Sequence, residues 1–540
     1  MFRSTSKSAG AAIGAPRIEG KRALNRRPAK PDPEPLPPSA DLAALALGGR
    51  INFFGFVLRL AARLPFLFIA GRLYGAEALG RFAYAVLVVE LAAQLATLGL
   101  KRGLAQQLAQ TDKPHVCIVW DALLVAALGS VIGMALLFLF PQAMFPNSEI
   151  YGMEWLLPTA VIALAWSDVM LAALAYRHDV GATVRARAVV EPWTISIAAL
   201  GLYFVSPRDG LLFAYALSML GAVIASAIPF LKSYGVPHDW SPAPATLWYM
   251  ARRNLPVAAA DAVEWGSRRV DIAILGLFVS PAVVGIYYVA QNIASLPSKL
   301  KTSFDPILGP VISRNIAAGN NQAVARQVRQ VGFWVIAAQL AVALALAIPG
   351  EGVLGLVGPA FVSGTAALAV LLFAEVVAAT ATVSESALIY CARKRNMAIS
   401  LAMILVQAGL SVVLILLFKR LGWTEIWQAA GPAIALFLAL GMAAIAKARL
   451  LSHLLHAPVS GWRWELVWAA LAAVAAGQLA ILLPEWLELS VGIPAILLAF
   501  GAVLWWRGFT AEDRELFKMK KSDIADLSLP DPSTGGDAPR

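Results

Sequence analysis

Residues 257–278, VAAADAVEWGSRRVDIAILGLF, are as long and apolar as a membrane-spanning helix, yet they contain five charged side chains. Within one helix, the spacing of Asp261, Glu264, Arg268 and Asp271 (i, i+3, i+7, i+10) predicts that they share a face. A charge facing lipid costs about 2.5 kcal/mol or more on insertion scales, so this face is expected to look into protein or a wet cavity. The alternative is internal pairing of Glu264 with Arg268, one turn away. Neighbouring Arg269 adds positive charge that the acids need not neutralise, which favours the cavity.

The composition indicates a polytopic membrane protein rather than soluble domains. Of 540 residues, 59% are hydrophobic and only 14% are charged, and the mean hydropathy is +0.70. Apolar runs of membrane-spanning length recur almost from end to end. The two cysteines, Cys117 and Cys391, and the five histidines show no metal-ligand spacing.

We place about fourteen spans of about 20 residues, which predicts an all-α polytopic membrane protein. Their approximate limits are 51–71, 80–100, 116–140, 155–175, 188–206, 211–231, 256–278, 283–298, 331–349, 364–390, 398–418, 427–446, 465–483 and 487–506.

The basic residues favour an even number of spans with both termini in the cytoplasm. Of 44 lysines and arginines, 35 fall in the tails, the cytoplasmic loops or the span edges of this topology. The others lie in outer loops (Arg72, Arg81, Arg208, Lys419, Arg420) or within spans (Arg59, Arg63, Arg268, Arg269). Topology therefore accounts for the net charge of +11, and no nucleic-acid partner is needed. Residues 1–45 and 511–540 are expected to be cytoplasmic tails, the first basic and disordered, without the apolar stretch of a secretory signal.

An internal repeat divides the chain. At an offset of 205 residues, LYGAEALGRFAYA (73–85) aligns with FVSPAVVGIYYVA (278–290), and Arg63 falls on Arg268. Because six spans separate the copies, both enter the membrane in the same direction, which predicts a parallel repeat about an axis along the membrane normal. The expected units are an N-lobe at 46–235, a C-lobe at 236–450, and two further spans at 451–510.

Other polar side chains also interrupt the spans. In the first span, Arg59 and Arg63 lie one turn apart with Asn52 on about the same face and no acid nearby, which favours a cavity over snorkelling. Further polar residues are spread over spans two, four, eight and ten: Glu90, Asp168, Tyr288, Gln291, Asn292 and Glu375. Each alone is more often a hydrogen-bond partner between helices than a substrate ligand.

These features resemble the oligosaccharide (Wzx-like) flippases of the MOP superfamily, to which lipid II flippases and MATE drug exporters are related. The six-plus-six-plus-two arrangement is similar. Three stretches of sequence also resemble the family's patterns, namely residues 73–104, residues 271–314, and Gly358-Pro359-Ala360-Phe361 before span ten.

The resemblance implies a flippase of the bacterial inner membrane, without enzymatic activity. Such a protein moves a polyprenyl-diphosphate-linked oligosaccharide to the periplasmic leaflet by alternating access, for O-antigen or exopolysaccharide synthesis. Its expected partners are this substrate, membrane lipids, and a polysaccharide polymerase and glycosyltransferases.

The resemblance also implies a cationic cavity between the lobes. Arginine suits a diphosphate because its guanidinium donates paired hydrogen bonds to phosphate oxygens. The substrate-binding candidates are Arg59, Arg63, Arg268, Arg269, Asn52, Gln291, Asn292 and Tyr288. The acids depart from a purely anion-binding cavity and could couple transport to H⁺ or Na⁺: Asp261, Glu264, Asp271, Glu90, Asp168 and Glu375. No cofactor is expected, and no GxxxxGK[ST] motif for ATP occurs.

Three alternatives remain. The sequence poorly distinguishes a lipid II flippase from a flippase for an O-antigen or exopolysaccharide unit. A MATE-type cation-coupled exporter should have acid-dominated cavities without buried arginines. A polytopic polysaccharide polymerase or ligase would be expected to have a large outer loop with basic and histidine residues, whereas the outer loops here are short.

Overall fold

The computed structural model describes residues 64–510 and Asp513, with gaps at 111–112, 151–153, 239, 299–311, 314 and 317. All regular elements within these residues are helical. Nine helical segments of this described part are long and apolar enough to cross a membrane. The all-α polytopic fold is therefore confirmed, whereas the count of fourteen spans stays a prediction.

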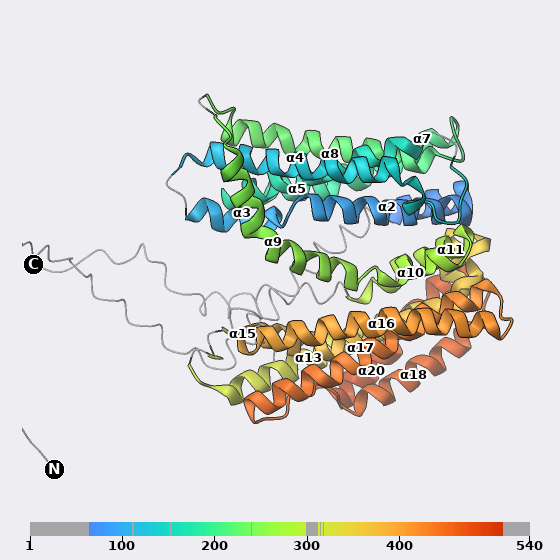
Figure 1. The fold of residues 1–540 in the computed structure, drawn as a ribbon. Helices are drawn as coiled ribbons and strands as arrows, with labels where there is room; N and C mark the ends of the chain where they lie inside the picture. The colour runs from blue at the N-terminus through green and yellow to red at the C-terminus, as the bar shows by residue number, and fades with distance from the viewer. Residues whose placement is uncertain are drawn as a thin grey trace, which may run out of the picture.

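The first bundle consists of the helices from α2 to α8 (Figure 1). Its main elements are η1 (Ala70–Tyr74), α2 (Gly75–Ala96), α3 (Leu100–Ala109), α4 (His115–Leu139), η2 (Pro141–Ala143), η3 (Glu154–Thr159), α5 (Ala160–Tyr176), α6 (Val180–Thr183), η4 (Val184–Val190), α7 (Glu191–Tyr203) and α8 (Gly210–Tyr234). The apolar side chains of α2, α4, α5 and α8 form its core.

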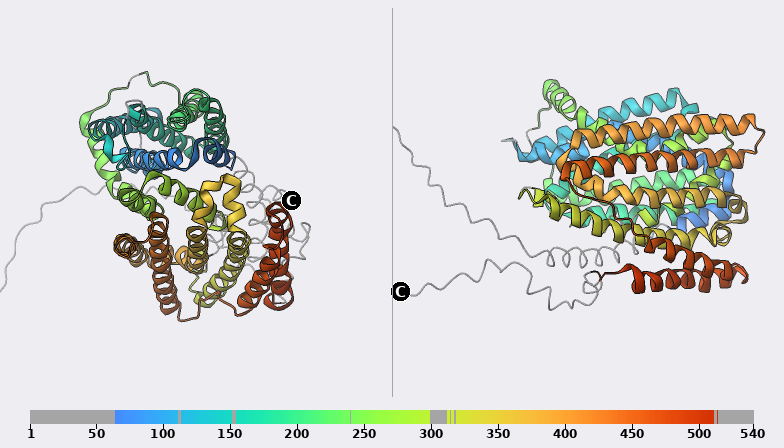
Figure 2. Two further views of the ribbon diagram at one scale, coloured as in Figure 1. Left: turned by 90° about the vertical axis from the view of Figure 1, so that its right-hand side faces the viewer. Right: turned by 90° about the horizontal axis from the view of Figure 1, so that it is seen from below.

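The second bundle comprises the helices from α13 to α17. It is built from α13 (Asn321–Ala347), α14 (Gly350–Val357), η6 (Pro359–Gly364), α15 (Thr365–Cys391), α16 (Arg393–Arg420) and α17 (Glu425–Leu455). The end-on view in Figure 2 shows the two bundles side by side. Between them lie α9 (Pro244–Ser267), α10 (Val270–Phe278) and α11 (Pro281–Ala294), and α11 packs against both α2 and α15.

The C-terminal helices form a separate pair beside α13, visible in dark red in Figure 2. The pair comprises α18 (Glu465–Ala480), α19 (Glu485–Leu487), η7 (Glu488–Gly492), α20 (Ile493–Val503) and η8 (Leu504–Gly508). Asp513 anchors the pair: its buried carboxylate accepts hydrogen bonds from Gln330 and Trp334 of α13 and from Arg463 beside α18, each at 3.0 Å.

The expected continuous span at 256–278 is wrong. Two helices replace it, because α9 ends at Ser267 and α10 begins at Val270. Gly266 and Ser267 are poor helix formers, and the Ser267 hydroxyl donates to the Glu264 carbonyl oxygen at 2.8 Å. The next two amides, of Arg268 and Arg269, therefore bond three residues back rather than four, which closes the helix in a tight turn.

The broken span connects the two bundles. Helix α9 packs mainly on α2, α3 and α4 of the first bundle, whereas α10 packs mainly on α16 and α17 of the second and also contacts α2. The turn at Arg268 and Arg269 therefore lies where the chain passes from one bundle to the other.

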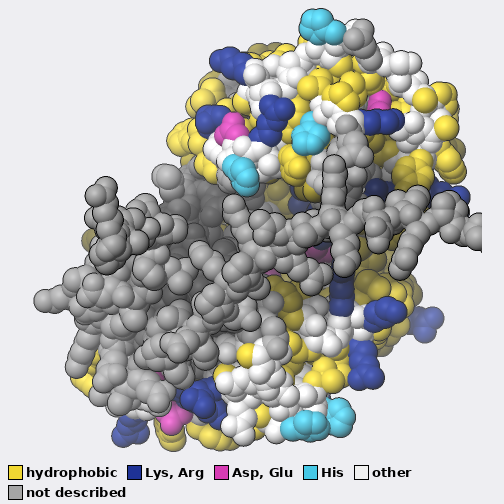
Figure 3. All heavy atoms as spheres, turned by 90° about the vertical axis from the view of Figure 1, so that its left-hand side faces the viewer, with side chains coloured by type: hydrophobic (Ala, Val, Ile, Leu, Met, Phe, Trp, Pro, Cys, Tyr) yellow, Lys and Arg dark blue, Asp and Glu magenta, His cyan; other side chains and the backbone are white. Residues whose placement is uncertain are grey.

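Basic side chains gather at the end of the molecule that contains the start of α9. Figure 3 shows this end, where lysines and arginines outnumber acidic side chains in the described surface. It is the end that the sequence predicts to face the cytoplasm, and the orientation itself stays a prediction.

Candidate functional site between the bundles

The candidate site is built around the turn between α9 and α10. Arg268 is exposed, and its side chain has no hydrogen bond or ion pair with any residue that the structure describes. Arg269 behaves differently: its Nη1 lies 2.8 Å from Glu90 Oε2 of α2, and its guanidinium lies 5.2 Å from the centre of the Trp265 ring. The turn therefore presents one uncommitted guanidinium beside one that a carboxylate already holds.

A second ion pair ties α9 to the first bundle. Arg102 of α3 lies 3.0 Å from Asp261 Oδ1 and donates to Glu264 Oε2 at 2.7 Å. Glu264 thus pairs with another helix rather than with Arg268. The α3–α9 contact is close because Gly103 has no side chain: a Cβ there would lie 1.9 Å from Asn254 Oδ1.

Asp271 does not share a face with Asp261 and Glu264, contrary to the expectation, because the turn rotates α10 relative to α9. Its carboxylate is buried, with 1% of the residue exposed. Oδ2 accepts hydrogen bonds from Tyr287 at 2.9 Å and from Gln291 at 2.6 Å, and Oδ1 accepts one from the Ile272 amide at 2.9 Å. These donors belong to α10 and α11, so Asp271 joins these two helices.

The other predicted residues are placed as follows. Asn292 donates to the Tyr288 carbonyl oxygen of its own helix at 2.8 Å, and both side chains are half-buried. Glu375 is half-buried on α15 of the second bundle. Asn52, Arg59 and Arg63 lie outside the described residues, so their part in the site stays a prediction.

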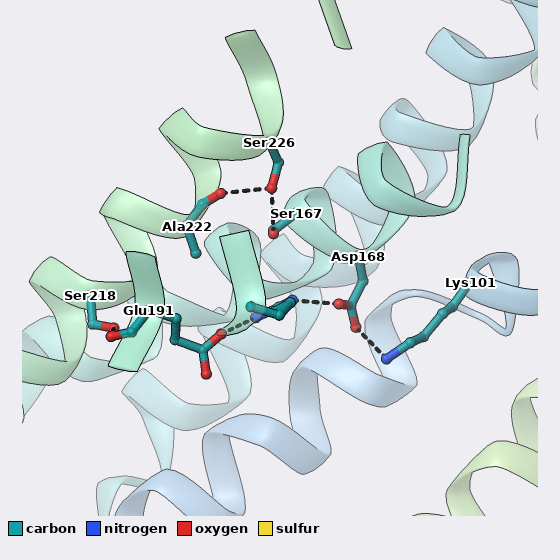
Figure 4. A network of polar contacts seen from close by, with 8 residues as sticks. Lys101, Ser167, Asp168, Glu191, Ser218, Ala222 and Ser226 are labelled. Carbon is teal, nitrogen blue, oxygen red and sulfur yellow. Dashed lines mark hydrogen bonds and ion pairs between the residues drawn. The ribbon is translucent and has the colours of Figure 1, made fainter. Parts of the chain in front are cut away.

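Asp168 belongs to a network inside the first bundle, shown in Figure 4. Its carboxylate accepts from Lys101 of α3 at 3.1 Å and from Arg187 of η4, and Arg187 also donates to Glu191 at 2.8 Å. Lys101 points toward Asp168 from a neighbouring helix in this view. The network balances two cations with two carboxylates and joins α3, α5 and η4.

One buried hydroxyl of the first bundle is without a partner in the described part of the chain. Tyr215 of α8 is 4% exposed, and its oxygen has no hydrogen-bond partner among the described residues.

The charges of the site are mostly neutralised by internal pairs, which differs from a simply cationic cavity. Arg102 contacts two carboxylates, Arg269 contacts one, and Arg268 contacts none within the described residues. Of these three arginines, Arg268 alone has five N–H donors that no described residue occupies, so it is the one most available to an anion. The described residues contain no group of three or more His, Cys, Asp and Glu side chains that could hold a metal ion.

Several residues of the site were missed by the sequence analysis. Lys101 and Arg102 were counted only as cytoplasmic charges, yet each pairs with an acid of another helix. Arg187 and Glu191 had a detectable signal, since they are opposite charges four residues apart. Tyr287 had no signal in the sequence, because only the packing of α11 on α10 brings its hydroxyl to Asp271.

Comparison with known proteins agrees with the helical fold. A family model described as "Polysaccharide biosynthesis protein" matches residues 69–336. The structure is similar to a lipid II flippase MurJ in an inward closed conformation, with a TM-score of 0.61 and 12% identity, covering 86% of this chain and 99% of that one. No curated protein sequence matches the chain significantly.

Multidrug resistance MATE family transporters of the MOP superfamily are similar as well. An inward-facing structure gives a TM-score of 0.59 at 15% identity, covering 74% of this chain and 98% of that one. An outward-facing structure gives a TM-score of 0.52 at 14% identity, covering 78% of this chain and 96% of that one. At 12–15% identity these likenesses concern the fold: the chain has the helical fold of these transporters, as the resemblance predicts.

Proposed function

We propose that this protein is a MOP-type transporter that translocates a polyprenyl-diphosphate-linked oligosaccharide from the cytoplasmic to the periplasmic leaflet, for O-antigen or exopolysaccharide biosynthesis. The observation that carries the proposal is Arg268. It is an exposed arginine without a described partner, at the turn where the chain crosses between the bundles. A permanently charged group is retained at such a position when it has an anion to bind.

The chemistry of the turn suits a diphosphate. Guanidinium groups bind phosphate oxygens through pairs of parallel hydrogen bonds. Arg59 and Arg63, if the predicted repeat holds, would add two cations from the first span. The family match to polysaccharide biosynthesis supports a lipid-linked saccharide as the cargo.

Coupling to H⁺ or Na⁺ is part of the proposal. Asp271 is the best-placed candidate, because its buried carboxylate has three neutral donors and no described cation. Binding or loss of a proton there would change the packing of α10 on α11, next to the turn. We place the protein in the bacterial inner membrane, multi-pass with both termini cytoplasmic, alongside a polymerase and glycosyltransferases.

The alternatives can be ranked by the same residues. A lipid II flippase has the same need for a diphosphate site and stays the nearest competitor. A cation-coupled drug exporter is less favoured, because Glu90, Asp168, Asp261 and Glu264 are all in ion pairs with lysine or arginine. These acids leave no excess of negative charge for a cationic drug among the described residues. A polymerase or ligase is less favoured because of the short outer loops.

The test is the leaflet distribution of polyprenyl-diphosphate oligosaccharide in cells that lack the gene. We expect the lipid-linked unit to accumulate in the cytoplasmic leaflet and the wild-type gene to relieve the accumulation. Radiolabelled lipid II, followed in the same cells, distinguishes an oligosaccharide flippase from a lipid II flippase, since only the latter should leave lipid II in the cytoplasmic leaflet when the gene is absent. A normal distribution of both lipids, in a strain without a second flippase, would overturn the proposal and direct attention to drug efflux.

A further inference from the structure

The arginines of the candidate site differ in how many carboxylates pair with each of them. Arg102 is held by two acids, Arg269 by Glu90 alone, and Arg268 by none of the described residues. The Arg269–Glu90 pair is also accessible, with 38% and 26% of the two side chains exposed. An incoming anion can therefore reach Arg269, provided that it displaces the Glu90 carboxylate.

We propose that Glu90 is an intramolecular placeholder for the substrate's phosphate, and that substrate binding releases α2 from the α9–α10 turn. The inference rests on the proposed function. A carboxylate and a phosphate offer a guanidinium similar pairs of acceptor oxygens, so each can replace the other on Arg269. Arg268 captures the diphosphate, and its second phosphate then competes with Glu90 for the neighbouring arginine.

This exchange joins binding to movement. The Glu90–Arg269 pair links α2 of the first bundle to the turn that leads into the second. A ligand shifts a conformational equilibrium only by its difference in affinity between the two states. Because the diphosphate gains Arg269 only where the pair is broken, it favours the state in which the turn is detached from α2. Without Glu90 this ion pair is absent, so binding of the diphosphate would have no pair to release.

The test uses the full-length purified protein in detergent and farnesyl diphosphate as the probe, with uncharged farnesol as a reference. We expect Glu90→Gln to bind farnesyl diphosphate about two- to fivefold more tightly than wild type. In wild type, binding must first break a partly exposed ion pair, which costs a small amount of free energy, and the variant has no such pair. Glu90→Asp, which keeps the charge, should restore much of the wild-type affinity. The gain should vanish when Arg269→Ala is added, because both changes act on one pair.

A matched control is Glu385→Gln. Glu385 also forms an ion pair, at 3.2 Å from Lys447 Nζ, but its partners are α15 and α17 of the second bundle. Its loss should leave probe affinity unchanged. Spin labels on α2 and α10 supply a second readout: the probe should lengthen the α2–α10 distance in wild type and not in Glu90→Gln.

The outcomes are distinct. Unchanged or weaker binding by a folded Glu90→Gln, in a protein whose wild type binds the diphosphate, overturns the placeholder role and leaves the proposed function standing. If wild type binds farnesyl diphosphate no better than farnesol, the proposed function fails and the inference fails with it. Tighter binding that survives in Glu90→Gln with Arg269→Ala would also overturn the inference, because it would not act through Arg269.

Discussion

Gly80 and Gly285 face each other where α2 and α11 cross, and each occupies the position of the other in the repeat. A Cβ on Gly80 would lie 1.7 Å from the Pro281 carbonyl oxygen, and one on Gly285 would lie 2.0 Å from that of Ala76. Pro281 follows Ala76 at the same offset of 205 residues, so the contact is reciprocal. This is the arrangement expected of two copies related by an axis between the bundles. It also makes the contact sensitive to a single methyl group.

Gly80→Ala should separate the bundles at this end, because the added methyl group meets backbone that cannot move aside. Overpacking of this kind costs about 1–3 kcal/mol. The measurement is the distance between spin labels on Pro207→Cys and Ser363→Cys, in a background with Cys117 and Cys391 replaced by serine. Gly201→Ala is the control, since a Cβ there meets nothing within 4 Å. Equal distance distributions for Gly80→Ala and wild type would contradict the prediction.

Arg268→Ala should leave the protein in the membrane and abolish translocation, because the uncommitted guanidinium is lost. Arg268→Lys should recover transport only partly, since an ammonium cannot donate the paired hydrogen bonds. The measurement is relief of cytoplasmic-leaflet accumulation by each variant, normalised to expression. Arg252→Ala removes an exposed arginine from the preceding helix, α9, and should transport normally. Wild-type transport by Arg268→Ala would assign this arginine a structural role.

Asp271→Asn should keep the packing of α10 on α11 and remove the dependence of transport on an ion gradient. Asparagine has nearly the same shape, and its one carbonyl oxygen can still accept from Tyr287 and Gln291, although its NH2 cannot accept from the Ile272 amide. It neither binds a proton nor carries the negative charge that attracts a cation. Transport of the lipid-linked unit would be followed in proteoliposomes under an imposed pH or Na⁺ gradient. Tyr287→Phe, which deletes one neutral hydrogen bond at about 1 kcal/mol, is the control for packing and should keep the gradient dependence. Full gradient dependence in Asp271→Asn would exclude this residue from coupling.

Asp513→Ala should loosen the C-terminal helix pair from α13. Burial opposes ionisation of this carboxyl, but hydrogen bonds from Thr510, Gln330 and Arg463 outweigh burial and hold its pKa below the ordinary value. Loss of these charge-assisted bonds should cost roughly 2–3 kcal/mol of unfolding free energy.

The same carboxyl gives a pH dependence with a defined sign. Because the folded pKa is lowered, the stabilisation is complete above the unfolded value of about 3.9 and is lost as the pH falls through the folded pKa. Thermal unfolding of wild type and Asp513→Ala should therefore differ at pH 7 and converge below about pH 4. Asp179→Asn, which alters an exposed pair 3.8 Å from Arg185, should change stability by less than about 1 kcal/mol at either pH. A constant difference between wild type and Asp513→Ala across this range would contradict the assignment.

The sequence by itself determined that the chain crosses the membrane many times and that its regular structure is helical. Both depend on patterns within one helix, namely apolar length and charge placement. The relation of the first span to the seventh stays a prediction, which the reciprocal contact of Gly80 and Gly285 supports. The sequence also singled out Arg268 and Arg269, because charge inside an apolar segment is costly wherever the segment packs.

Only the tertiary structure decided which charges are available. The partners of Glu90, Asp168, Asp261 and Asp271 come from other helices, so no spacing within a helix could identify them. The turn after Ser267 moved Asp271 away from the face that helical periodicity gave it. Ion pairing and helix ends depend on what packs against a segment, whereas periodicity depends on the segment alone. That difference separates Arg268, which has no partner among the described residues, from the paired Arg102 and Arg269.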